Sequence, residues 1–330
     1  MLLCLAAVAA HFLAPQAWLD SLPVAAARFV HGSVDLLGRM WWGLLAGIFF
    51  VGLLARVPRE LVAGVLGPGG RVGGLLRATA AGLALDLCSH GILLVGMQLY
   101  RRGASLGQTA AFLIASPWNS ISLTLILCGL IGVPWTLAFI GLSAAVAVLA
   151  GFLLDACVGR GTLPPNPNAH TLPADFRFWK AVAGHWGRLR MDGAFWKGVA
   201  GTGLRESRMI LRWIFFGVVL ASAIRALVDT AHFQHYFGPT AIGLLLTLLA
   251  TTLIEVCSEG SSPIAADLLT RAHAPGNAFA FLMAGVATDY TEIMGLKETT
   301  RSWKTALFLP LTTVPQTLLI GWLLNHFAGG

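Results

Sequence analysis

The chain has 330 residues, of which 56% are hydrophobic and 11% are charged, and its formal net charge is +7. Soluble domains carry roughly a quarter charged residues, so this composition excludes an ordinary soluble protein and indicates a chain that lies in a lipid bilayer. The basic residues lie mostly in loops and at helix ends, and no motif that combines basic and aromatic residues indicates nucleic-acid binding. The five scattered cysteines form no disulfide framework.

The N-terminal segment, residues 1–33, contains an apolar helix and a connector. It lacks the positively charged start of a secretory signal peptide, which favours an additional span over a signal sequence, the alternative for this segment.

Residues 34–158 form a first membrane repeat, for which the apolar pattern predicts four spans. Two of these are interrupted, one by Cys88-Ser89-His90-Gly91 and one by Ser116 to Ser120. Gly and Pro inside a span release backbone groups that lipid cannot satisfy, so such breaks survive only where they face protein or a wet cavity. The four predicted spans are 34–55, 72–102, 106–132 and 134–155.

A polar, Pro-rich linker with a basic amphipathic helix occupies residues 159–204. Because cytoplasmic loops are enriched in Lys and Arg, the linker is predicted to lie in the cytoplasm. Arg101, Arg102 and Arg271 are predicted to lie on the same side as the linker. The opposite side then holds Arg56, Arg59, Arg71 and Arg225.

Residues 205–330 repeat the first unit at an offset of 169 residues. This offset pairs Cys88 with Cys257, Gly91 with Gly260, and the segment "AFLIA" from Ala111 with "AFLMA" from Ala280. The sequence therefore predicts an all-α polytopic membrane protein, a tandem duplication of a four-span unit with about eight core spans. An even number of spans makes the two halves parallel, whereas an odd number would make them inverted.

Ionisable residues gather at the predicted breaks, and inside a membrane such residues mark functional pathways. Two thiols, an imidazole and a carboxylate suit a thiophilic or borderline ion, so Cys88, His90, Cys257 and Glu259 form a candidate metal site. The alternative is structural, with cysteines used for close packing and His90 paired with Glu259. The predicted substrate-binding residues are Cys88, Ser89, His90, Gly91, Ser116, Pro117, Asn119, Cys257, Ser258, Glu259 and Gly260.

Four carboxylates near the breaks are candidates for an ion or proton relay, because removal from water favours the protonated form of a carboxyl group. For two of them, Asp289 and Glu292, pairing with Lys297 or Arg301 at the helix end is an equally good interpretation. The four are Asp86, Glu255, Asp289 and Glu292.

The segments Cys88-Ser89-His90-Gly91, "YRRGASLGQTAAFLIASP" and "CSEGSSPIAADLLTRAHAPGNAFAFLMAGVATDYTEIM" resemble a bacterial family of predicted permeases that includes organoarsenical efflux permeases and related Cu/Zn exporters. The resemblance implies efflux of toxic soft species, driven by an ion gradient, with H⁺ as the expected coupling ion. His90 stands where the family often has a second cysteine, which moves the expected substrate toward a borderline divalent ion or an organic solute. Trp118 replaces a small residue of the family pattern.

The sequence leaves several functional alternatives. Besides efflux of a soft metal, metalloid or organometalloid species, the chain could export an organic solute with structural cysteines. Two further classes are an intramembrane enzyme with Cys88 or Cys257 as nucleophile and His90 as base, and a binding subunit without transport. The expected partners are the lipid bilayer and a small molecule or ion. No cofactor and no catalytic activity are expected, and a homo-oligomer stays open.

Overall fold

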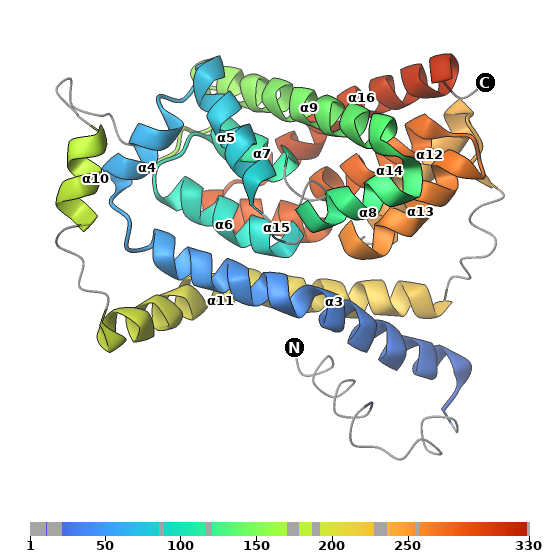
Figure 1. Cartoon of the computed structure of the whole chain (residues 1–330), viewed down its shortest axis with the longest axis horizontal. Coiled ribbons are helices and arrows are strands. Elements are labelled where there is room, and N and C mark those ends of the chain that lie inside the picture. Colours follow the sequence, from blue (N-terminus) through green and yellow to red (C-terminus); the bar gives the residue numbers. More distant parts are fainter. Residues whose placement is uncertain are drawn as a thin grey trace.

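The computed structural model describes His11 and residues 22–85, 87, 89–115, 121–169, 178–186, 192–227, 236–254 and 258–328. Every regular element within these ranges is helical (Figure 1), which confirms the all-α class. The helices are α3 (Val24–Leu54), α4 (Arg59–Leu66), α5 (Val72–Ala84), α6 (Ser89–Arg101), α7 (Leu106–Ala115), α8 (Ile121–Ile131), α9 (Val133–Gly159), α10 (Phe178–Trp186), α11 (Gly193–Leu227), α12 (Ala241–Ile254), α13 (Ser258–Thr270), α14 (Pro275–Thr288), α15 (Tyr290–Thr300) and α16 (Trp303–Ala328).

The helix boundaries recur along the chain at the spacing of the sequence repeat. Ser89 and Arg101 bound α6, and Ser258 and Thr270 bound α13; both pairs differ by 169 positions (258 − 89 and 270 − 101). The offset of 169 positions also relates both ends of α8 to those of α15. It relates the first residues of α3, α5 and α7 to the first residues of α11, α12 and α14. Similar residues at this spacing therefore occupy equivalent helices.

The helices α5 and α6 form a hairpin, so the prediction of one interrupted span over 72–102 is wrong. The carboxylate of Asp155, near the end of α9, accepts hydrogen bonds from two backbone N–H groups at 2.7–2.8 Å. One belongs to Gly70, just before α5, and the other to Gly107, shortly after α6. Both ends of the hairpin therefore lie at the same end of the molecule, and the chain reverses at the break.

The equivalent helices α3 and α11 pack side by side in antiparallel directions (Figure 1). A Cβ added at Gly52 would meet the carbonyl oxygen of Val199, and one added at Gly203 would meet that of Ile48. Residue numbers therefore rise along α3 as they fall along α11. This is the geometry of inverted repeats, and the prediction of parallel repeats is wrong.

The hairpin explains why the count of spans misled the sequence interpretation. The long helices α3 and α9 of the first half, and α11 and α16 of the second, run lengthwise through the molecule (Figure 1). The α5–α6 hairpin enters and returns instead, and α12–α13 is its equivalent by the repeat. Replacing one of the four predicted crossings of a half by a hairpin leaves an odd number, which inverts the second half.

The centre of the bundle is built from the two halves together. All of α7 is buried, and the described side chains of α14 are buried as well. Phe139 of α9 contacts Phe279 of α14 with ring centroids 5.5 Å apart. The two halves thus share one hydrophobic core, around which the hairpins are arranged.

Candidate functional site: the hairpin tip and the α14–α15 break

The tip of the α5–α6 hairpin presents Ser89, His90 and Gly91 at the start of α6. All three are buried, and the Ser89 hydroxyl lies 3.4 Å from Nδ1 of His90. Gly91 packs directly on α3, because a Cβ added at Gly47 would lie 2.8 Å from the Cα of Gly91. The imidazole of His90 is therefore fixed where α6 begins and where the hairpin rests on α3.

The second helix break falls at Asp289, between α14 and α15. The backbone of Asp289 is extended (φ −60°, ψ 135°), so the α-helix stops at Thr288 and restarts at Tyr290. The side chains of Asp289 and Glu292 are only 5% and 3% exposed. Buried carboxylates are costly unless they serve as partners for other groups, which makes this break a candidate site rather than a passive bend.

Two contacts fix the position of this break. The Tyr290 hydroxyl donates a hydrogen bond to the carbonyl oxygen of Trp213 in α11 at 2.6 Å, and its ring packs against the Trp213 and Phe216 rings. On the other side, the hydroxyls of Thr288 and Thr252 lie 2.8 Å apart. The break is therefore held between α11 and α12.

The hairpin tip and the α14–α15 break are neighbours. A Cβ added at Gly295 of α15 would lie 3.2 Å from the side chain of Leu93 in α6. Both helices start near the middle of the molecule and run toward the same end (Figure 1). His90 and Glu292 each lie three positions before this contact, on two helices that pack against each other.

Several predicted site residues lie outside the described residues, so their convergence is untested: Asp86, Cys88, Ser116, Pro117, Asn119, Glu255 and Cys257. Ser258, Glu259 and Gly260 begin α13, but their side chains belong to the same undescribed set. In the part of the chain that is described, no three His, Cys, Asp or Glu side chains are grouped as metal ligands. The described cysteines, Cys128 and Cys157, are free thiols.

Two helices within the described ranges are long and apolar enough to cross a bilayer by themselves, α9 and residues Trp303–Phe327 of α16. Shorter apolar helical stretches cover Leu44–Leu54, Val72–Ala84, Leu106–Ala115 and Ala241–Leu253. A family model described as "Predicted permease" matches residues 26–326. The chain belongs to this predicted-permease family.

The chain is similar to a protein of Mycobacterium tuberculosis (strain ATCC 25618 / H37Rv) named "Putative permease Rv2963". It is 28% identical over 228 residues, which cover 64% of this chain and 55% of the relative. The aligned region thus spans about half the length of that relative. No solved structure matches the chain.

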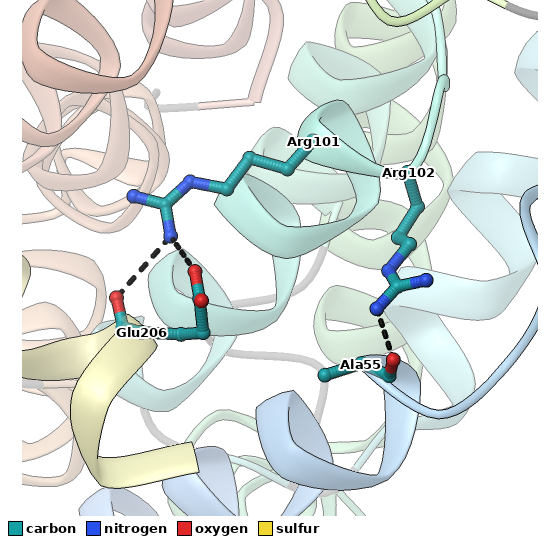
Figure 2. A network of polar contacts seen from close by, with 4 residues as sticks. All are labelled: Ala55, Arg101, Arg102 and Glu206. Carbon is teal, nitrogen blue, oxygen red and sulfur yellow. Dashed lines mark hydrogen bonds and ion pairs between the residues drawn. The ribbon is translucent and has the colours of Figure 1, made fainter. Parts of the chain in front are cut away.

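A polar network at the C-terminal end of α6 was not predicted from the sequence. Arg101 donates to the carboxylate of Glu206 in α11 at 2.9 Å, and Arg102 donates to the carbonyl oxygen of Ala55 at the end of α3 (Figure 2). Arg102 also donates to the carbonyl oxygen of Val57 at 3.0 Å. Burial and the charge of Arg59 lower the pKa of Arg102, while Glu206 raises it. The sequence offered one signal for this network: Arg102 has an arginine, Arg271, at the equivalent position of the second repeat.

Most of the basic residues described gather at the end of the molecule that carries this network. The guanidinium of Arg56 lies 5.6 Å from the ring centroid of Phe195 at the start of α11, and α4, which begins at Arg59, packs on α10. Arg71 directly precedes α5. The prediction that these three arginines lie opposite the linker is therefore wrong, because it assumed a continuous span over 72–102. Arg271, at the end of α13, lies at the opposite end instead.

Proposed function

We propose that this protein is a secondary-active membrane permease whose substrate passes between the hairpin tips and the helix breaks at the centre of the molecule. The observation that carries the proposal is the burial of Asp289 and Glu292 in the α14–α15 break, next to the start of α6. Inverted repeats with broken helices, whose polar groups lie at mid-depth, are typical of secondary transporters. Membership of a permease family supports the same function over an enzyme or a binding subunit.

The proposed substrate is a toxic soft metal, metalloid or organometalloid species. Cys88 and Cys257 offer thiolates, and His90 and Glu259 offer one nitrogen and one oxygen ligand, a set that suits soft and borderline ions. A site that used all four in a closed cage would hold its cargo too tightly for release. Transport therefore requires exchange between incomplete ligand sets on the two hairpins.

The proposed direction of transport is export across a bacterial inner membrane. The substrate enters at the basic end of the molecule, which the positive-inside tendency assigns to the cytoplasmic side. Asp289 and Glu292 are proposed to carry the coupling proton. A protonated carboxyl group is neutral and stable in a buried position, whereas its ionised form attracts a cation or a proton from the opposite side. Binding of cargo and binding of the proton can then alternate.

A transport assay in everted membrane vesicles tests the substrate site. Uptake of arsenite, methylated trivalent arsenic, antimonite, copper and zinc is measured for the wild type and for Cys88→Ser, His90→Ala and Glu259→Gln. Each variant is expected to lose transport of the true substrate by at least about tenfold, as removal of a ligand or its support does. Cys128→Ser and Cys157→Ser serve as controls, since both thiols lie away from the breaks. Wild-type rates in all three site variants would reject this site.

An organic solute is the second candidate substrate. The imidazole of His90 at the hairpin tip favours it, because an imidazole binds polar organic groups by hydrogen bonding while it weakens a dithiol site. In that case Cys88→Ser and Cys257→Ser would retain transport, and His90→Ala alone would lose it.

A further inference from the structure

The end of the α6 helix is fastened to two helices by adjacent arginines. The Arg101 guanidinium contacts both the carboxylate of Glu206 (2.9 Å) and its backbone carbonyl oxygen (3.2 Å) in α11. The Arg102 guanidinium donates to the carbonyl oxygen of Val57 at 3.0 Å and to that of Ala55. Figure 2 shows the two side chains diverging from one helix end to these separate partners. We call this set the arginine clamp.

The Arg102 contact is directed at a helix C-terminus. The last carbonyl groups of a helix have no intrahelical partner and carry partial negative charge, which a guanidinium neutralises. Ala55 is the C-cap of α3 and Val57 lies two residues beyond it, so the clamp joins the α5–α6 hairpin to the end of α3 through Arg102 and to α11 through Arg101. It therefore fixes the hairpin against the antiparallel α3–α11 pair.

The second half retains one of these arginines but uses it differently. Arg102 corresponds to Arg271 at the offset of 169, and Ala55 corresponds to Ile224 near the end of α11. Arg271 forms its ion pair within its own chain segment, with Asp267 four positions earlier at 3.2 Å, and its side chain is 74% exposed. The Arg271 side chain is thus mostly exposed, whereas Arg102 is half-buried.

The two hairpins also differ in packing. Every residue of α6 from Ser89 to Tyr100 is buried, and Gly91 rests on Gly47 of α3. In α13, Ile264 is 39% exposed, and Thr270 at its end is exposed. The described part of α13 packs on α14 and α8, as α6 packs on the equivalent α7 and α15, but α6 also packs closely on α3, the long helix of its own half. The two equivalent hairpins are therefore arranged differently among the described residues. Inverted repeats that exchange such arrangements produce access from alternate sides.

We propose that the arginine clamp is the gate at the basic end of the molecule and that Arg271 is its counterpart at the opposite end. In the conformation described, the clamp holds the α5–α6 hairpin against α3–α11. In the opposite conformation the clamp opens, the α12–α13 hairpin docks on α11, and Arg271 exchanges Asp267 for carbonyl groups at the end of α11. This gate rests on the proposed transport function, for which it supplies the conformational step.

Hydrogen–deuterium exchange of the full-length protein in lipid nanodiscs tests the gate without a substrate. Arg102→Ala should increase amide exchange in α6 by about tenfold, the effect expected from loss of a charged hydrogen bond, and should decrease exchange in α13. Arg271→Ala, the matched variant, should shift the balance the other way and leave α6 at least as protected as in the wild type. Arg102→Lys, which keeps a cationic donor, should lie between the wild type and Arg102→Ala.

The reciprocal response separates a gate from a structural contact. If Arg102→Ala increases exchange in α6 but leaves α13 unchanged or also increases its exchange, the clamp only stabilises the fold and the proposal is rejected. A reciprocal response without transport of any tested solute would support the gate and reject the proposed function alone. Transport with no reciprocal response would reject the gate alone.

Discussion

Asn277 makes in the second half of the chain the contact that Gln108 makes in the first. The Gln108 side-chain amide donates to the carbonyl oxygens of Leu66 and Gly67, in the loop before α5. The Asn277 amide donates at 3.0 Å to those of Phe237 and Gly238, in the loop before α12. The two residues are 169 positions apart, so the repeat preserves this link between a hairpin base and the next helix.

Replacement of either amide by an apolar side chain should destabilise the protein. Gln108→Leu and Asn277→Leu each leave two carbonyl groups without their donor, at a cost of about 1–3 kcal/mol in the free energy of unfolding. The measurement is thermal unfolding in detergent or nanodiscs. Gln108→Asn and Asn277→Gln keep the amide and should lose less, and equal losses in the amide and apolar variants would contradict this explanation.

Asp155→Asn should destabilise the protein less than Asp155→Ala does. Its carboxylate accepts from the N–H groups of Gly70 and Gly107 and from the hydroxyl of Ser105 at 2.8 Å. In the second half, the amide oxygen of Asn325 accepts from Gly276, the equivalent of Gly107, at 2.7 Å. Asp155→Ala should cost about 1–3 kcal/mol in unfolding free energy and Asp155→Asn less, as measured by thermal denaturation. A larger loss for Asp155→Asn than for Asp155→Ala would contradict the idea that an amide oxygen can replace the carboxylate as acceptor, as Asn325 does in the second half.

Gly203→Ala should disrupt the α3–α11 contact, whereas Gly201→Ala should not. A Cβ at Gly203 would overlap the carbonyl oxygen of Ile48, while a Cβ at Gly201 would meet nothing within 4 Å. Overpacking costs roughly 1–3 kcal/mol, but Gly to Ala in an open helix position gains about 0.5–1 kcal/mol. The midpoints of thermal unfolding should therefore move in opposite directions, and a shared direction would show that the helices are not in this close contact.

Asp289→Asn and Glu292→Gln should uncouple transport from the proton gradient. Both substitutions keep size and hydrogen bonding but remove the proton that the buried carboxyl groups are proposed to exchange. Substrate flux driven by an imposed pH gradient should fall at least about tenfold, in line with the cost of altering intramembrane ionisable groups. Glu298→Gln is the control, since Glu298 pairs with its neighbour Lys297. If both site variants respond to the gradient as the wild type does, these carboxylates are not the relay.

The sequence predicted the helices well but not the path of the chain between them. The boundaries near Val72, Leu106 and Val133 follow from apolar length, Gly and Pro, and the interruption near Ser89 follows from its polar residues. A break, however, permits the chain either to continue or to turn back, and both paths have the same hydropathy. The reversal is decided by tertiary contacts such as Gly70 with Asp155, which no local pattern contains.

One sequence observation did point to the hairpin. A continuous span over 72–102 assigns Arg56, Arg59 and Arg71 to the side opposite the basic linker, against the positive-inside tendency. The hairpin removes this conflict, because both of its ends lie at the basic end. Among the candidate site residues, buried Asp289 and Glu292 follow from the polar break in an apolar run. The partners of Arg101 and Arg102 lie in distant helices and could not be predicted.

Because α3 and α11 are inverted relative to each other, a comparison of equivalent residues in the two halves compares the charge at the two ends of the molecule. In a membrane, positions 169 apart in loops face opposite aqueous compartments. Arg56 and Arg102 keep an arginine at the equivalent position, whereas Arg59, Arg71 and Arg101 correspond to Val228, Thr240 and Thr270. The two ends of the molecule therefore differ in positive charge although the helices repeat, and by the positive-inside tendency such a difference favours one orientation in the membrane over its inverse.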